Sequence, residues 1–195
     1  MKSKIIIVII SIIAGLATGY FYLRPYEFHG TVIQSPDPSY DFILTSANGE
    51  VSPSNYLGKI VLIYFGYTSC PDICPTTLAH IARAMSELGK KSANIQVIMI
   101  SLDPERDTPE VLANYVAHFD PSFIGVTGTK TQIEKTASLY GIYYEKSGGI
   151  SAMGYTIDHT SILQVIDRKG YLKLVLPSDM TAEAIAADLN YMLKH

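Results

Sequence analysis

The stretch KIVLIYFGYTSCPDICPT, residues 59–76, joins an apolar segment to the only two cysteines of a 195-residue chain. Its first half, Lys59–Tyr67, is an almost continuous run of apolar and β-branched residues, which is typical of a strand buried on both faces of a sheet. Cys70 and Cys74 follow this strand and precede a helix. Loops beyond the carboxyl end of a strand are where α/β sheets bind ligands, so the cysteine pair is a candidate functional site.

Strands and helices alternate along most of the chain. An apolar stripe predicts a helix after Pro75, and Asn94–Leu102 is a second buried strand. Segment 107–110 supplies a cap, a first-turn proline and an acid to the next helix. A β-hairpin over 161–176 and a helix over 181–193 close the chain. The pattern predicts an α/β domain, in which a central mixed sheet has helices on both faces.

Shorter elements complete the expected order. Residues 42–45 form a strand candidate before an Asn48-Gly49 turn, and residues 123–126 form another. A helix is expected to end at Tyr140-Gly141. Residues 142–145 are expected to form a strand that enters a hairpin at Gly148-Gly149.

The first residues differ from the rest. Ile5–Leu23 contains nineteen uncharged residues, which as a helix would be about 28 Å long, close to the ~30 Å hydrocarbon core of a bilayer. Residues 1–24 are therefore predicted to form a transmembrane helix that anchors the protein. Residues 25–40, with three prolines, are expected to be a linker, and residues 41–195 the folded domain.

Charge around the apolar span indicates the location of the domain. Lys2 and Lys4 precede the span and Arg24 follows it, which favours a cytoplasmic N-terminus and an extracytoplasmic domain. That compartment is the periplasm in a bacterium and the intermembrane space in a mitochondrion. A signal peptide cleaved near residues 17–19 is the alternative, and either reading permits oxidised cysteines. The net charge of −3 argues against a nucleic-acid partner.

The position of the cysteines favours reactive thiolates. Both precede or begin a helix, where partial positive charge stabilises a thiolate. Because the residue before a proline disfavours helical conformation, we expect Cys74 in the loop or at the helix cap. A disulfide needs sulfurs ~2.05 Å apart, whereas two thiolates on one metal ion lie roughly 3.8 Å apart. The pair can therefore be oxidised and metal-free, or reduced and metal-competent. A purely structural disulfide across so short a loop would stabilise the fold little.

The cysteines lack the number of partners that a structural zinc site needs, because such sites usually have four Cys or His ligands. Two soft thiolates with one imidazole suit copper. Of the five histidines, His29 lies in the expected linker and His195 at the chain end. His80 is expected to point away from the loop, and His118 to end a helix. His159, at the entry to a predicted strand, is the favoured candidate for a third ligand.

Three segments in this order resemble the Sco family: YFGYTSCPDICPTTL at 64–78, SLDPERDTPEVL at 101–112 and IDHTSILQVIDRKG at 157–170. Members of this family are membrane-anchored proteins with a thioredoxin-like fold that deliver copper to cytochrome c oxidase. The resemblance covers roughly residues 40–195 and the anchor. It implies a thioredoxin-like central mixed sheet flanked by helices.

The resemblance also implies the metal ligands. Cys70 and Cys74 match the two copper thiolates of the family, and His159 matches its copper histidine, for one copper per chain as Cu(I) or Cu(II). In thioredoxin-like domains, the loop that enters the strand after the last crossover lies against the cysteine motif. Thioredoxins place a cis-proline there, and this chain places His159. Asp158 either orients the imidazole or is a turn residue.

Four further residues have both a structural and a functional interpretation. Asp103, Asp107 and Thr108 match the second signature of the family, either as loop turns and a helix cap or in a direct role. Asp72, between the cysteines, either influences the thiolates or is a solvated loop residue. The segment EKSGGISAMGY, 145–155, lies where family members vary, which leaves partner recognition open. Its Met153 is a soft donor, although a single methionine is more often a packing residue.

Taken together, these features lead to two main hypotheses. The first is a copper metallochaperone that serves the copper site of cytochrome c oxidase during its assembly. Its partners would be an oxidase subunit, the membrane, and other copper chaperones or thiol reductants. The second is a thiol–disulfide oxidoreductase that uses Cys70 and Cys74 to reduce the cysteines of that oxidase site, so enzymatic activity stays an open question. The three-residue spacer departs from the C-x-x-C of thioredoxin-like reductases.

Two other classes fit the sequence less well. Thr68-Ser69-Cys70 lacks the Thr-x-x-Cys spacing with which peroxiredoxins activate their cysteine. A purely structural binding module would leave both loop cysteines unexplained.

Overall fold

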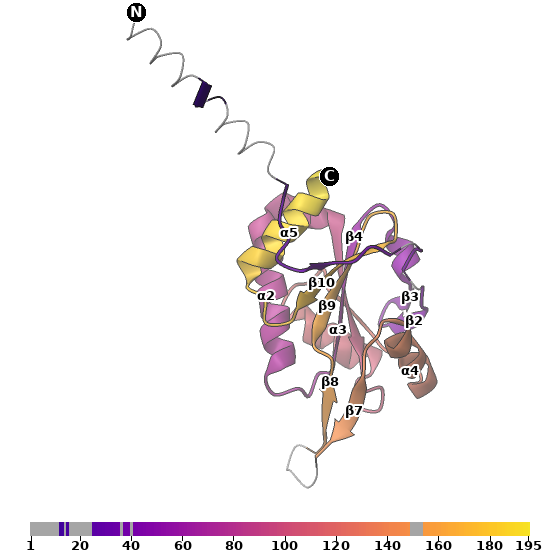
Figure 1. Ribbon diagram of the computed structural model, residues 1–195. Coiled ribbons are helices and arrows are strands. Elements are labelled where there is room, and N and C mark those ends of the chain that lie inside the picture. The colour runs from indigo at the N-terminus through magenta and orange to yellow at the C-terminus, as the bar shows by residue number, and fades with distance from the viewer. Residues whose placement is uncertain (1–11, 14, 16–24, 36, 40, 149–153) are drawn as a thin grey trace, which may run out of the picture.

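A six-stranded mixed sheet forms the centre of the protein (Figure 1). The computed structural model describes residues 12, 13, 15, 25–35, 37–39, 41–148 and 154–195. The sheet order is β1-β10-β9-β4-β5-β6. Strands β4, β5 and β6 pair in parallel, whereas the β4–β9, β9–β10 and β10–β1 pairs are antiparallel. The bounds are β1 Thr31–Val32, β4 Ile60–Gly66, β5 Ile95–Ser101, β6 Ile124–Val126, β9 Ile162–Ile166 and β10 Leu172–Pro177.

Helices cover both faces of this sheet, as predicted. Gly66 of β4 lies against α2, and Gly125 of β6 lies against α3. The β4, β5 and β6 registers place both glycines on the same face, where α5 packs beside α2 (Figure 1). On the opposite face Phe65 contacts Tyr140, which ends α4. The bounds are α2 Ile73–Leu88, α3 Pro109–Ala117, α4 Lys130–Leu139 and α5 Ala182–Lys194, with 3-10 helices η1 Pro53–Tyr56 and η2 Gly89–Asn94.

The two apolar runs form the core strands. All seven residues of β4 and all seven of β5 are buried, which confirms the interpretation of 59–67 and 94–102 as strands covered on both faces. Thr108 caps α3 by accepting a hydrogen bond from the backbone N–H of Val111 at 3.3 Å. The proline at the start of this helix lacks an N–H that would have no partner there.

Two short hairpins lie outside the central sheet. The first pairs β2, Leu44–Ser46, with β3, Gly49–Val51. The second pairs β7, Tyr144–Ser147, with β8, Thr156–His159. Strand β8 was not expected, because its four residues are too few for a clear alternating pattern. As a result His159 ends a strand of its own instead of entering the strand that begins at Ile162.

The expectation that Cys74 lies outside the helix is wrong. Helix α2 begins at Ile73, so Cys74 is its second residue and Pro75 its third. The first four N–H groups of a helix have no partner within it, so a proline there removes no hydrogen bond. The steric bias that proline imposes on the preceding residue is outweighed in this first turn.

The predicted transmembrane helix lies outside the described residues, apart from Ile12, Ile13 and Gly15. Within the described ranges, none of the helices combines the length and the hydropathy needed to cross a bilayer.

Part of the expected linker is bound to the domain through one buried carboxylate. Asp188 of α5 is fully buried. It accepts hydrogen bonds from the Tyr26 hydroxyl at 2.8 Å and from the backbone N–H groups of His29 and Gly30 at 3.0 and 3.1 Å. The His29 ring also places its Nδ1 at 2.8 Å from this carboxylate. The Tyr26 ring stacks on Tyr191 with centroids 4.2 Å apart, so residues 26–30 are held on α5.

Replacing Asp188 should therefore release this segment. We expect Asp188→Ala to lower the free energy of unfolding by about 1–3 kcal/mol, because several donors lose a buried acceptor. Chemical denaturation measures the change, and hydrogen exchange should accelerate at residues 26–30. Asp179→Ala, which alters an exposed carboxylate, should stay within about 0.5 kcal/mol of the unaltered protein. Equal stability of the two variants would show that the Asp188 contacts contribute nothing.

Candidate metal centre

The strand order brings two distant segments to one edge of the sheet. Strands β4 and β9 are antiparallel, with Tyr64 opposite Leu163. The carboxyl end of β4 therefore lies beside the amino end of β9. The loop that carries Cys70, residues 67–72 and here called the cysteine loop, follows β4. His159 precedes β9 by three positions. This topology explains why side chains 85 positions apart in the sequence meet.

The three side chains predicted as ligands lie together at this edge. The Nε2 atom of His159 is 3.8 Å from the Sγ atom of Cys74. The Sγ atom of Cys70 accepts the backbone N–H of Cys74 at 3.5 Å. The two cysteines form no disulfide with each other; Cys74 is buried and Cys70 is half-buried. A thiolate and an imidazole on one tetrahedral ion are roughly 3.6 Å apart, so the Cys74–His159 separation fits two donors that share an ion.

The three donors do not yet form a closed cluster. Across the described ranges, no group of three or more His, Cys, Asp or Glu side chains is already arranged to hold a metal ion. The sulfur of Cys70 lies beside the backbone N–H of Cys74. A three-donor site therefore requires some rearrangement of these side chains.

A backbone carbonyl determines which nitrogen of His159 is available. The Nδ1 atom lies 3.2 Å from the Thr160 carbonyl oxygen. A carbonyl only accepts hydrogen bonds, so Nδ1 carries the proton and Nε2 presents a lone pair toward Cys74. One of the two roles suggested for Asp158 was to orient the ring. Asp158 is exposed. Its side chain points to the opposite face of β8, because neighbouring residues in a strand alternate.

The walls of the site are close-packed. The rings of Tyr64 and Tyr67 lie edge-on to His159, with centroids 6.4 and 6.3 Å away. A Cβ atom at Gly66 would be 2.9 Å from the Sγ atom of Cys74 and 2.9 Å from the Tyr64 ring. Only a glycine at the end of β4 allows the buried thiol to approach the strand this closely.

The two thiols differ in acidity. A hydrogen bond from the Cys74 thiol lowers the pKa of Cys70 to about 5, assisted by the backbone N–H groups of Asp72 and Cys74 and by the Tyr67 hydroxyl, while burial opposes the shift. The same contact with Cys70, together with burial, raises the pKa of Cys74. At neutral pH the pair therefore holds one proton, on Cys74, and the outer sulfur is a thiolate.

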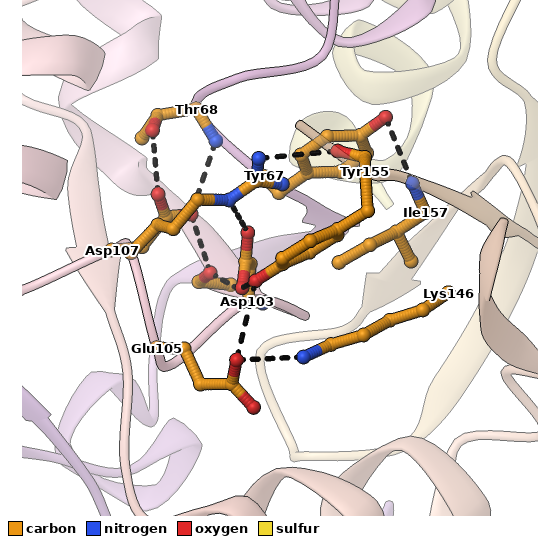
Figure 2. Close-up of polar contacts among 10 residues, drawn as sticks. Tyr67, Thr68, Asp103, Glu105, Asp107, Lys146, Tyr155 and Ile157 are labelled. Atoms are coloured by element: carbon orange, nitrogen blue, oxygen red, sulfur yellow. Dashed lines mark hydrogen bonds and ion pairs between the residues drawn. The ribbon is translucent and has the colours of Figure 1, made fainter. Parts of the chain in front are cut away.

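A buried carboxylate holds the cysteine loop (Figure 2). Asp107 is fully buried. It accepts hydrogen bonds from the backbone N–H of Thr68 at 3.0 Å and from the Thr68 hydroxyl at 2.5 Å. The Ser101 hydroxyl, at the end of β5, donates to the same carboxylate at 2.6 Å. Two roles were predicted for Asp107, a structural role in the loop and a direct role at the site. These contacts support the structural role.

Asp103 performs a similar task for the β7–β8 hairpin (Figure 2). It is fully buried, and it accepts the Tyr155 hydroxyl at 2.6 Å and the Nε–H of Arg106. The Arg106 guanidinium lies 3.8 Å from the centroid of the Tyr155 ring. Arg106 and Tyr155 were not singled out from the sequence. The available signal was a cation placed between two aspartates in the DPERDTP segment.

The other candidates do not reach the site. Asp72 is exposed at the start of α2 and its side chain makes no capping hydrogen bond. His80 and His118 each place Nδ1 near a backbone carbonyl, at 3.0 and 2.6 Å. The His195 ring lies against a tyrosine of α5. Met153 lies outside the described residues.

Comparisons with known proteins identify relatives of the chain. The SCO1/SenC family model matches residues 31–194. The SCO2-like protein of Rickettsia felis is 37% identical over 185 residues, which cover 89% of this chain and 90% of that protein. The structure of Bradyrhizobium japonicum ScoI with copper bound is 38% identical, has a TM-score of 0.73, and covers 80% of this chain and 99% of its own.

A more distant structure agrees in fold. BsSco, described as a member of the Sco family of cytochrome c oxidase assembly proteins with a disulfide switch, is 23% identical with a TM-score of 0.63, over 83% of this chain and 98% of its own. These likenesses confirm the predicted α/β, thioredoxin-like fold with a mixed sheet flanked by helices. By the family match over residues 31–194 and the identity to a relative over nine-tenths of its length, the chain belongs to the SCO1/SenC family.

Proposed function

We propose that this protein is a membrane-anchored copper metallochaperone that delivers copper to the copper site of cytochrome c oxidase during its assembly. The observation that carries the proposal is the 3.8 Å separation of the His159 Nε2 and Cys74 Sγ atoms, with Cys70 adjacent. Two thiolates and one imidazole form a donor set that suits copper. The copper-bound ScoI of B. japonicum and the oxidase-assembly family of BsSco support the assignment.

Copper is the cargo in this proposal, one ion per chain. The Cys70 thiolate, half-exposed and deprotonated at neutral pH, offers the first ligand. Binding then displaces the remaining proton from Cys74, because only a thiolate coordinates the metal. The Nε2 lone pair of His159 completes the set. In release, donors of the acceptor would replace Cys70 first, because Cys70 is the more exposed of the two sulfurs.

The proposed anchor would orient the site relative to the membrane. We assign residues 1–24 to the anchor and residues 41–195 to the copper-binding domain, in the periplasm or the intermembrane space. Residues 26–30 are held on α5, near the C-terminus. The β7–β8 hairpin lies at the opposite end of the domain (Figure 1). An anchored domain would therefore present copper away from the bilayer, to the extramembrane part of an oxidase subunit.

A second function is favoured by the lowered pKa of Cys70. As a thiol–disulfide oxidoreductase, the Cys70 thiolate would attack a target disulfide, form a mixed disulfide and release one target thiolate. Cys74 would then attack the Cys70 sulfur, which frees the second target thiolate and leaves a Cys70–Cys74 disulfide. The target would be the cysteine pair of the oxidase copper site, reduced before it receives the metal.

Copper binding tests the role of His159. The reduced full-length protein should bind one copper per chain, and His159→Ala should lower the Cu(II) affinity at least about 10–100-fold and change the thiolate-to-copper absorption band. His80→Ala is a matched change of a histidine that does not reach the site. It should leave the Cu(II) affinity and the absorption band unaltered. Oxidation to the Cys70–Cys74 disulfide should abolish binding, because both sulfurs are then consumed. An unaltered Cu(II) affinity and spectrum in His159→Ala would refute the site.

The acidity of the thiols can be measured by alkylation. In the reduced metal-free protein, iodoacetamide should modify Cys70 first, at a rate that falls as the pH drops through about 5. Cys74 should react only at much higher pH, because its pKa is raised. In urea both cysteines should react with a midpoint near the ~8.5 of an ordinary thiol. Equal reactivity of the two cysteines in the folded protein would contradict the assigned proton distribution.

A further inference from the structure

The strand that carries His159 is not part of the central sheet. In the described part of the chain, β8 pairs only with β7, as a separate two-stranded sheet. Strand hydrogen bonds therefore do not fix the hairpin relative to the cysteine loop. Apart from the short connection of β8 to β9, the position of the imidazole over Cys74 depends on contacts between the hairpin and its surroundings.

These contacts lie on the same face of the strand as His159. Side chains alternate along a strand, so Tyr155, Ile157 and His159 point to one side. Ile157 is buried, and its backbone N–H donates to the Tyr67 hydroxyl at 3.2 Å (Figure 2). Tyr67 itself stands three positions before Cys70. One contact of the hairpin thus reaches the cysteine loop directly.

Arg106 joins the hairpin to the same loop. Its guanidinium carbon is 3.8 Å from the centroid of the Tyr155 ring and 5.9 Å from that of Tyr67. Its Nη1 donates to the Tyr155 carbonyl oxygen at 3.1 Å, and its Nε donates to Asp103. A planar guanidinium can stack on rings and donate in fixed directions at once, which an ammonium group cannot do.

Asp103 connects this contact to the central sheet. Its carboxylate is fully buried and accepts the Tyr155 hydroxyl at 2.6 Å. Its backbone N–H donates to the hydroxyl oxygen of Ser101, the last residue of β5, at 2.9 Å. On the exposed side, Lys146 lies 4.4 Å from the Tyr155 ring centroid and pairs with Glu105 at 2.7 Å (Figure 2). The hairpin is thereby held against the ends of β4 and β5.

We propose that Asp103, Arg106 and Tyr155, here called the hairpin clamp, are positioning residues that hold the His159 imidazole over Cys74. The proposal rests on the proposed copper site. Cys70 comes from the β4–α2 connection and Cys74 from the first turn of α2, so neither sulfur lies on the hairpin. The clamp therefore controls the imidazole alone, and with it the ability of the site to hold Cu(II), whereas soft thiolates suffice to select Cu(I).

Copper titrations of full-length Arg106→Gln test whether the hairpin clamp affects the binding of Cu(II) but not that of Cu(I). We expect the Cu(II) affinity to fall about 10–100-fold, as for other residues that orient a metal ligand, with a change in the thiolate-to-copper absorption band and the electron paramagnetic resonance spectrum. The Cu(I) affinity, measured by competition with a chelator, should change less than about threefold. In the His159→Ala background, Arg106→Gln should have almost no further effect on Cu(II), because coupled residues are not additive.

Matched variants complete the experiment. Arg83→Gln removes a guanidinium that forms exposed ion pairs with Glu87 and Glu183. This variant should bind Cu(I) and Cu(II) with unaltered affinity. If Arg106→Gln does not fold, Tyr155→Leu decides, because it removes both the stacked ring and the hydroxyl from a half-buried position. A variant of the clamp that folds and keeps its Cu(II) affinity and spectrum would overturn the proposal. Equal losses for Cu(I) and Cu(II) would also overturn it.

The two proposals fail in different ways. If His159→Ala leaves Cu(II) binding unaltered, the copper site itself is wrong. If His159→Ala weakens Cu(II) binding and the clamp variants do not, only the positioning role is wrong.

Discussion

The central position of β4 is the constraint on which the site depends. Its seven residues are all buried, so the strand has to lie between two neighbours and beneath side chains on both faces. It pairs in parallel with β5 and antiparallel with β9. The carboxyl ends of β4 and β5 and the amino end of β9 consequently meet at one edge. The cysteine loop, the aspartates after β5 and His159 are each attached within a few residues of these three strand ends.

Three buried aspartates organise the segments that regular structure does not hold. Asp107 binds the cysteine loop, Asp103 binds the β7–β8 hairpin, and Asp188 binds residues 26–30. A buried carboxylate is costly unless it is paired and hydrogen-bonded. Each of these accepts hydrogen bonds from two or more groups, so each favours one arrangement of the segment it holds over the alternatives. At the site, the cysteine loop and the hairpin are therefore each held by a buried carboxylate on an apolar scaffold.

The acidities of the thiols follow from the same placement. Cys74 lies in the first turn of α2 against Gly66, where it is fully buried. Cys70 lies outside the helix, near several donors. One thiolate at the surface and one protonated thiol beneath it suit both metal exchange and disulfide exchange. This explains why the sequence supported two functional hypotheses and why the family assignment alone does not separate them.

Much of the fold was predictable because it is recorded in local patterns. The core strands β4 and β5, the cap at Thr108 and the terminal β-hairpin and helix agree with the structure. Strand β8 was missed and Cys74 was misplaced. In four residues alternation is hard to recognise, and the effect of a proline depends on where the helix begins. His159 was the favoured histidine from its place before a predicted strand, and the family resemblance then matched it to a copper ligand, whereas the Arg106–Tyr155 contact was not anticipated.

The sequence by itself determined which donors exist: two sulfurs, one favoured imidazole and an apolar strand leading to them. Tertiary structure alone decided the 3.8 Å approach of His159 to Cys74 and the contact of Tyr155 with Asp103 in the hairpin clamp. The physical reason is range. Periodicity and capping report interactions over a few residues, whereas these contacts join segments about 50–90 residues apart, and they form only when the sheet has brought its strand ends together.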